Sequence, residues 1–199
     1  MVEVKVLIFG YLQTDKNISF QMNTETLLTT DRLLIEPLVL ADNNFILELV
    51  NTDGWIKFIG NRKITSPMEA TAYIQKILDN PNVNYWVVKL KDDKTAIGVV
   101  TFIKRDYLDH HDIGFAFLPD FCGSGYAYEA TLAVLNKMVQ QHNHSHILAT
   151  TIPENSNSIK LLEKLGLQFE KEIKVEKETL HVYAVSIEKL NTPYPYTKG

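Results

Sequence analysis

A glycine-rich passage in the middle of the chain constrains the fold more than any other feature of the sequence. The strand-like run His111–Leu118 ends at Pro119, the small residues Cys122–Ala127 follow soon after, and a helical pattern then continues to about Gln141. The next strand-like run, Ile147–Ile152, comes soon after that helix. A strand, a helix and a strand in this order predict a parallel pair of strands joined by a right-handed crossover.

The runs on either side of this unit predict antiparallel strands and further helices. Ser66, Pro67 and Glu69 carry the pattern of a capping box at a helix start. The other expected strands are Arg32–Glu36, Tyr85–Lys91, Ala96–Lys104, Phe169–Val175 and Leu180–Glu188, and the other expected helices are Phe45–Val50, one that begins at Pro67, and Asn155–Leu165. The predicted fold class is therefore α/β, with a mixed sheet of about seven strands, one central parallel pair, antiparallel ends, and helices on both faces.

Composition and length exclude several classes of protein. With 199 residues, 45% of them hydrophobic, the chain suits a single globular domain. A net charge of −4 without a basic cluster argues against binding nucleic acid through its phosphates. No apolar run approaches the ~20 residues of a membrane-spanning helix. The single cysteine, Cys122, excludes an intrachain disulfide and a cysteine-built zinc site, and it fits a reducing cytoplasm, where we expect the protein to be.

We divide the chain into three parts. Residues 1–26 carry no motif and are expected to form an N-terminal extension, a strand or arm that is partly flexible. Residues 27–190 are expected to form the domain, and residues 191–199 a frayed C-terminal tail.

The loop Cys122–Ala127 has the properties of an anion-binding site. The first turn of a helix presents unpaired N–H groups and a partial positive charge, so it stabilises a phosphate group without a basic side chain. Gly123 and Gly125 remove side chains that would hold phosphate oxygens at a distance. The spacing is not a dinucleotide fingerprint, because Tyr128 stands at the third glycine position, and no P-loop lysine follows. A turn that needs glycine for its dihedral angles alone is the alternative interpretation.

A second motif lies downstream at Pro153–Ser158 and continues into Leu161–Leu167. With these two motifs, the chain from Leu28 to Leu190 resembles the GNAT superfamily of acetyl-CoA-dependent N-acetyltransferases, and within it the branch of ribosomal-protein N-terminal acetyltransferases (RimJ/RimL-like). The other segments that carry the resemblance are Thr30–Leu33, Thr65–Pro67, Ile113–Phe115 and Gly125–Ala130.

The resemblance implies where acetyl-CoA binds. In the family, the pyrophosphate lies on the loop Gln/Arg-x-x-Gly-x-Gly/Ala, and pantetheine inserts between the two parallel strands. The cofactor-binding residues implied on this chain are Phe115, Phe117, Cys122, Gly123, Ser124, Gly125, Tyr126, Ala127 and Asn155. Cys122 departs from the family pattern and removes a polar side chain that assists the phosphates. Asn155 has a second, compatible interpretation as the cap of the following helix.

Acetyl transfer to a neutral amine also needs groups that accept and donate protons. Asp112 is the expected base, because many relatives carry a glutamate there that faces the substrate. His110 and His111 are the alternative bases. The non-catalytic interpretation of Asp112 is an exposed acid at the start of a strand. Relatives place a tyrosine that acts as the general acid at the position of Leu162. Because leucine cannot donate a proton, Ser158 is the expected proton donor instead. An ordinary residue of the first helical turn is the alternative for Ser158.

Two other chemistries are not expected. Cys122 faces the phosphate loop without an adjacent histidine, which argues against a nucleophilic role. His142, His144 and His146 alternate at a helix end and loop without a carboxylate or cysteine at ligand spacing, so no metal site is expected.

The acceptor is expected to be a primary amine, and by branch resemblance a protein N-terminus. The alternatives are a small amine such as an aminoglycoside, polyamine or amino acid, or, in another class, a catalytically silent CoA-binding module. The aromatic-rich loop Gly54–Thr65, with Trp55, Phe58 and Arg62, is the expected substrate-binding segment, with core packing as the alternative. The expected partners are acetyl-CoA and the amine acceptor, and no binding to nucleic acid or membrane is expected. The protein is expected to be a monomer or a homodimer.

Overall fold

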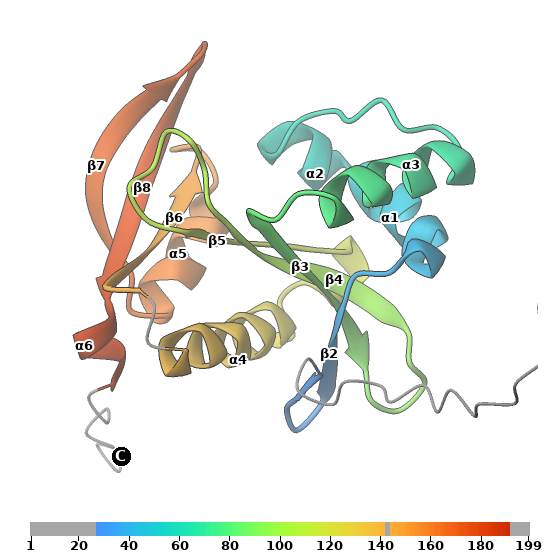
Figure 1. Cartoon of the computed structure of the whole chain (residues 1–199), viewed down its shortest axis with the longest axis horizontal. Coiled ribbons are helices and arrows are strands. Elements are labelled where there is room, and N and C mark those ends of the chain that lie inside the picture. The colour runs from blue at the N-terminus through green and yellow to red at the C-terminus, as the bar shows by residue number, and fades with distance from the viewer. Residues whose placement is uncertain (1–26, 142–143, 192–199) are drawn as a thin grey trace, which may run out of the picture.

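The computed structural model describes residues 27–141 and 144–191 of the chain. The predicted extension at 1–26, most of the predicted tail, and His142 lie outside these described residues. Within them the chain forms one eight-stranded mixed sheet with helices on both faces (Figure 1). The strands are β1 (Leu28–Thr29), β2 (Leu33–Pro37), β3 (Val83–Leu90), β4 (Ala96–Ile103), β5 (Asp112–Phe117), β6 (His146–Thr151), β7 (Gln168–Val175) and β8 (Glu178–Ser186). The α-helices are α1 (Asn43–Val50), α2 (Asp53–Phe58), α3 (Pro67–Leu78), α4 (Tyr126–Gln140), α5 (Ser156–Lys164) and α6 (Ile187–Asn191), and two short 3₁₀ helices are η1 (Leu40–Asp42) and η2 (Pro119–Phe121).

The strand order is β1-β2-β3-β4-β5-β6-β8-β7. Within the described residues every neighbouring pair is antiparallel except β5 and β6, which are parallel and are joined through α4. This central pair confirms the prediction made from the strand, helix, strand order. The additional strand is the two-residue β1, which is too short for a period-two pattern to reveal.

The sheet separates two hydrophobic cores. Successive side chains of a strand point to opposite faces, so Trp86 and Val88 of β3 pack with Leu135 of α4, whereas Val87 packs with Ile74 of α3. In Figure 1, α4 lies along one face and the group of α1, α2 and α3 along the other. The β7–β8 hairpin continues the same sheet beyond β6.

Helix α3 begins as its sequence predicts. The Ser66 hydroxyl accepts a hydrogen bond from the Glu69 N–H at 3.3 Å, and the Glu69 carboxylate accepts one from the Ser66 N–H at 3.1 Å. Pro67 occupies the first helical turn, where its missing N–H is not needed.

The segment Gly54–Thr65 differs from the predicted loop, because its first part is helical. Helix α2 begins after Thr52, whose hydroxyl accepts a hydrogen bond from the Trp55 N–H at 3.3 Å. Helix α2 is six residues long and too short to show an amphipathic repeat. The N-cap residue Thr52 was therefore the one sequence feature that indicated this helix.

Helix α4 is the longest described helix at 15 residues, which corresponds to about 22 Å. None of the helices in the described ranges has the length and apolar character needed to cross a membrane. The glycine-rich loop precedes the first residue of α4, and a hollow lined by His111 and His144 lies at its last turn.

Candidate functional site

The parallel strands β5 and β6 are paired at one end and diverge toward the other. Strand β5 pairs with β4 along all six of its residues, from Asp112 to Phe117. Among the described residues its pairing with β6 is confined to Asp112 opposite Leu148, where the Leu148 N–H donates to the His111 carbonyl at 2.9 Å. The strands thus form a splay that opens toward the carboxyl end of β5.

Three residues of β5 direct their backbone groups into this splay. Alternate residues of a strand present their N–H and C=O groups to the same edge, and His111 presents its carbonyl to β6. The carbonyl of Ile113 and the N–H and C=O groups of Phe115 and Phe117 therefore face the same way, beyond the last rung of the ladder. Phe115 and Phe117 are two of the predicted cofactor-binding residues.

The glycine-rich loop connects β5, through η2, to the start of α4. Gly123 and Gly125 have φ values of +80° and +82°, which non-glycine residues rarely adopt, and Gly125 is the N-cap of α4. A Cβ atom at Gly123 would meet no atom of the described residues within 4 Å, and one at Gly125 would lie 3.4 Å from Arg32 Nη2. The space over this loop and the unpaired N–H groups of the first turn of α4 suit a phosphate group, so the residues present fit a CoA pyrophosphate.

Arg32 and Glu129 fix the start of α4, and sequence reasoning missed their connection. Arg32 Nε lies 2.7 Å from a Glu129 carboxylate oxygen, and Arg32 Nη1 donates to the Ser124 carbonyl at 3.0 Å. The same guanidinium lies 4.3 Å above the centre of the Tyr126 ring. Burial raises the pKa of Glu129, but hydrogen bonds from Thr30 and Arg32 outweigh it and hold that pKa below its ordinary value. Arg32 thus contacts both the glycine-rich loop and the helix.

Cys122 lies exposed beside this loop. Its thiol donates to the Leu118 carbonyl at 3.5 Å. Partial burial raises the pKa of the thiol, which disfavours the thiolate at neutral pH. These surroundings give no support to a nucleophilic role.

Asp112 is placed differently from the accessible acid that the sequence suggested. Its side chain is 2% exposed and forms an ion pair with Arg105. The Thr150 N–H donates to one carboxylate oxygen at 3.2 Å and the Thr150 hydroxyl to the other at 3.1 Å. Burial raises the pKa of Asp112, against the opposing effects of Arg105 and Thr150. A base role for Asp112 stays a prediction, and its ion pair with Arg105 and two hydrogen bonds from Thr150 favour positioning over proton transfer.

Helix α5 places the second motif beside β6. Asn155 is the N-cap of α5, and its side-chain oxygen accepts a hydrogen bond from the Ser158 N–H at 3.2 Å. Ser158 is half-buried in the first turn of α5, and Leu162 is 2% exposed in the core. The capping role of Asn155 is thus present in the structure, while cofactor contact by Asn155 and proton donation by Ser158 stay predictions.

The three predicted substrate-binding residues separate into core and surface. Trp55 is 5% exposed and packs in the core beneath α1 and α3. Phe58 is half-buried, with Lys57 Nζ lying 4.9 Å from its ring centre, and Arg62 is exposed. Trp55 therefore packs in the core, whereas substrate binding by Phe58 and Arg62 stays a prediction.

Tyr107 lies at the splay and was not identified from the sequence. It belongs to the loop between β4 and β5 and is 43% exposed. Its hydroxyl lies close to the side chain of Thr150, just beyond the last rung of the β5–β6 ladder. Burial raises the pKa of Tyr107, and Arg105, Asp112 and Glu178 act on it electrostatically. No local sequence pattern reveals this position, because it depends on a contact between distant segments.

A hollow of about 700 Å³ lies between Tyr107 and the β7–β8 hairpin. Two carboxylates line it, Glu176 and Glu178, together with Lys177. The hollow is therefore lined by side chains of both charges beside the loop between β4 and β5.

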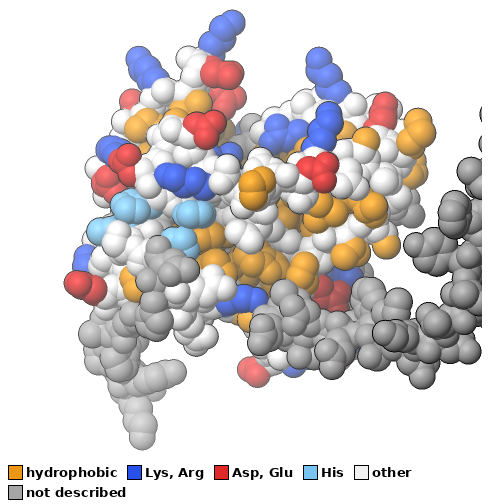
Figure 2. Space-filling model, viewed as in Figure 1, with side chains coloured by type: hydrophobic (Ala, Val, Ile, Leu, Met, Phe, Trp, Pro, Cys, Tyr) orange, Lys and Arg blue, Asp and Glu red, His pale blue; other side chains and the backbone are white. Residues whose placement is uncertain are grey.

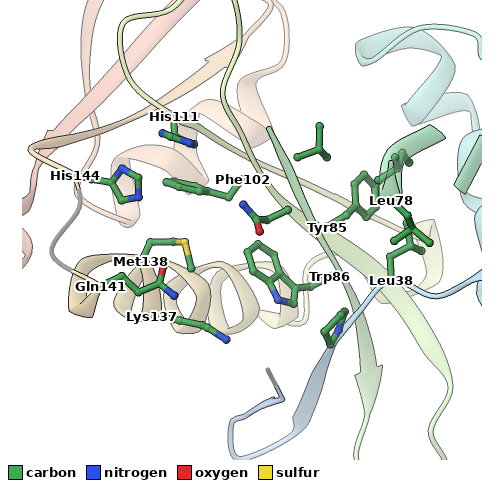
Figure 3. Close-up of a pocket in the computed structure, with 14 residues that line it drawn as sticks. Leu38, Leu78, Tyr85, Trp86, Phe102, His111, Lys137, Met138, Gln141 and His144 are labelled. Carbon is green, nitrogen blue, oxygen red and sulfur yellow. The ribbon is translucent and has the colours of Figure 1, made fainter. Parts of the chain in front are cut away.

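A second hollow, of about 370 Å³, lies at the far end of α4 from the glycine-rich loop. Figure 3 shows His111 and His144 beside Phe102, above Met138 and Trp86. The ring of His111 stacks on Phe102 with centres 4.8 Å apart and meets His144 edge-on at 4.7 Å. Histidine side chains gather on this part of the surface (Figure 2). Within the described ranges no group of three or more histidine, cysteine or acidic side chains is arranged to hold a metal ion.

Comparisons with known proteins agree with this geometry. Residues 32–168 match the family model described as the acetyltransferase (GNAT) domain. The uncharacterized N-acetyltransferase YnaD of Bacillus subtilis is 32% identical over 143 residues, which cover 72% of this chain and 83% of YnaD. A GNAT-family acetyltransferase from Bacillus anthracis superposes with a TM-score of 0.69 at 25% identity, covering 81% of this chain and 99% of that one.

One similar structure contains the cofactor. RimL, a ribosomal L7/L12 α-N-protein acetyltransferase in complex with coenzyme A, superposes with a TM-score of 0.72 at 14% identity, covering 81% of this chain and 98% of RimL. At this identity the likeness concerns the fold. The family model, the YnaD relative and the splayed α/β fold together show that this chain belongs to the GNAT family of N-acetyltransferases.

Proposed function

We propose that this protein transfers an acetyl group from acetyl-CoA to the α-amino group of a protein N-terminus. The observation that carries the proposal is the splay between β5 and β6, which opens next to a helix start whose two left-handed glycines leave its N–H groups accessible. GNAT acetyltransferases use acetyl-CoA, and acetyl-CoA supplies the activated acetyl group. Residues 27–190 would form the acetyltransferase domain.

Acetyl-CoA would be held by backbone groups at two places. The N–H groups of Gly123 to Ala127 would bind the pyrophosphate, supported by the helix dipole of α4. The backbone of Phe115 and Phe117 would pair with the amides of pantetheine, in place of the missing rungs to β6. The acyl end would then lie near Thr150, at the narrow end of the splay.

The acceptor would approach from the β7–β8 side. The carboxylates of Glu176 and Glu178 favour a positively charged acceptor, which a protein N-terminus and a polyamine both provide. Among these, the protein N-terminus is proposed because the chain resembles the RimJ/RimL-like branch and because RimL, by its description, acts on a ribosomal protein N-terminus.

Transfer would be direct, with the neutral amine attacking the thioester carbonyl. The Cys122 thiol has a raised pKa and lies beside the phosphate loop, which does not suit an acyl-enzyme. The leaving sulfur needs a proton, and Tyr107 is placed to supply it because its hydroxyl lies beside Thr150. Ser158 on α5 is the alternative donor.

A thiol-release assay over a panel of amines tests the acceptor. The full chain is incubated with acetyl-CoA and, separately, peptides with free N-termini, the same peptides blocked at the N-terminus, a polyamine, an aminoglycoside and free amino acids. We expect release with free N-terminal peptides and none with blocked ones. Turnover confined to a small amine would overturn the N-terminal acceptor, and acetyl-CoA binding by calorimetry without any turnover would indicate a silent module.

A substitution at Gly125 tests the cofactor placement. Gly125→Val forces an unfavourable φ and places a side chain over the loop, so acetyl-CoA affinity should fall at least tenfold, about 1.4 kcal/mol. Gly54→Val is the matched control, because Gly54 lies in α2 with open space around it and no positive φ. Equal affinity in a folded Gly125→Val protein would contradict the placement.

A further inference from the structure

We propose that Asp112 is a positioning residue whose carboxylate ends the β5–β6 ladder and so sets the point at which the two strands diverge. The inference rests on the proposed function, since it assigns the splay to acetyl-CoA. It replaces proton transfer by Asp112 with a role in shaping the cofactor site.

The register of the parallel pair identifies the rung that is replaced. The Leu148 N–H donates to the His111 carbonyl, and Asp112 lies opposite Leu148. In a regular parallel ladder the next donor of β6, the Thr150 N–H, would reach the Ile113 carbonyl. It donates instead to a carboxylate oxygen of Asp112 at 3.2 Å, and among the described residues the pairing ends there.

The carboxylate is held firmly in this position. The Thr150 hydroxyl donates to its second oxygen at 3.1 Å, and the Arg105 guanidinium forms an ion pair with the same oxygen. Asp112 is 2% exposed, so a charge this deep in the sheet depends on these partners. Because both oxygens are occupied, the carboxylate caps Thr150 more readily than it accepts a proton from a substrate.

The cap leaves neighbouring backbone groups available. With Thr150 bound by a side chain, the Ile113 carbonyl has no rung to β6 among the described residues, and the N–H and C=O groups of Phe115 and Phe117 remain open to the splay. Without the carboxylate, the Thr150 N–H would be a partly buried donor that lacks a protein partner, and pairing with Ile113 would satisfy it. The strands would then close by one rung over the place proposed for the acyl end.

Two substitutions separate positioning from base catalysis. Asp112→Asn keeps a side-chain oxygen that can accept from the Thr150 N–H, whereas Asp112→Ala removes it. If Asp112 positions the strands, the alanine variant should bind acetyl-CoA at least tenfold more weakly, while its kcat at saturating acetyl-CoA stays within about fivefold of wild type. The asparagine variant should lie closer to wild type in both quantities.

A base role gives the opposite pattern. Both variants would then lose ~10²- to 10⁴-fold in kcat with little change in acetyl-CoA affinity, and that result would overturn the proposal. Asp42→Ala is the matched control, because Asp42 is also an ion-paired carboxylate that is 9% exposed, but it contacts Lys89 rather than the splay. It should leave acetyl-CoA affinity unchanged.

A measurement on the free protein tests the rung itself. Scalar coupling through a hydrogen bond, between the Thr150 amide nitrogen and the Ile113 carbonyl carbon, should be absent in wild type and present in Asp112→Ala by NMR. If the alanine variant does not fold, the asparagine variant and the wild-type protein still test the proposal. A coupling between Thr150 and Ile113 in the wild-type protein would overturn it. A wild-type protein that binds no acetyl-CoA would refute the proposed function. The NMR coupling would then still test whether Asp112 ends the pairing of β5 with β6.

Discussion

Arg32 and Glu129 lie 97 residues apart in the sequence, yet two guanidinium nitrogens of Arg32 approach one Glu129 oxygen to 2.7 Å. The third nitrogen binds the Ser124 carbonyl, and the backbone N–H of Arg32 donates to the other Glu129 oxygen at 3.1 Å. One arginine therefore joins the turn after β1, the glycine-rich loop and the first turn of α4. This contact restricts the loop, whose two glycines impose little conformational restriction of their own.

Replacing Arg32 should weaken acetyl-CoA binding. Lysine keeps the charge but cannot bind the Glu129 carboxylate and the Ser124 carbonyl together through one planar group, so Arg32→Lys should raise the acetyl-CoA dissociation constant several-fold and reduce stability by about 1 kcal/mol. Calorimetry and urea unfolding measure the two effects. Glu170→Gln is the control, because Glu170 forms an exposed ion pair with Lys171 outside the loop. Arg32→Lys with wild-type affinity would show that the glycine-rich loop keeps its shape without the guanidinium.

The proton donor can be identified by comparing two hydroxyl deletions. If Tyr107 protonates the leaving sulfur, Tyr107→Phe should lower kcat by at least ~10²-fold, while Ser158→Ala should remain near wild type. Binding provides a readout independent of turnover. The wild-type protein should prefer CoA over desulfo-CoA through a hydrogen bond from Tyr107, and Tyr107→Phe should lose that preference.

The reverse ranking would assign the acid to Ser158. Equal, small effects of both substitutions would contradict a side-chain donor at either place and favour proton transfer to solvent. Phenylalanine keeps the ring of Tyr107 between the loop and the hairpin, so a change in fold is not expected.

The sequence predicted the elements with strong periodicity and the loop that joins them. The parallel pair, the antiparallel strands around it and the start of α3 follow from patterns within a few residues, and the structure confirms them. The left-handed glycines were predictable for the same reason, because their position between a strand and a helix is local. Helix α2 and strand β1 were missed, since six and two residues carry too little periodic signal. The five-residue helix α6 was missed as well, and the strand expected to reach Glu188 ends at Ser186.

The chemistry of the site was less predictable, because it depends on pairs that are distant in sequence. Asp112 could be assigned to the central strand, but its burial against Arg105 and Thr150 depends on how β6 and the β4–β5 loop pack. Trp55 has the composition expected of a binding loop and lies in the core. Tyr107 reaches the splay through a loop that carries no motif.

The histidine-lined hollow predicts how stability depends on pH. Burial lowers the pKa of His111, as do the neighbouring His144, Lys104 and His110. Burial also lowers the pKa of His144, with His110 adding to the effect. A lowered pKa means that the folded state binds the proton less readily than the unfolded chain does. As the pH falls below about 6.5, the unfolded state therefore gains protons that the folded state excludes, and stability should fall.

His111→Phe tests this dependence at the point where the ring stacks on Phe102. Phenylalanine preserves the stack and cannot be protonated. Between pH 7.5 and pH 5, the free energy of unfolding, measured by urea denaturation, should therefore decrease less in His111→Phe than in wild type. Glu129 also has a lowered pKa, but its contribution is lost mainly below about pH 4.3, outside this window. Glu129→Gln should accordingly keep the wild-type decline between pH 7.5 and pH 5. A decline in His111→Phe as steep as in wild type would show that His111 does not contribute to it.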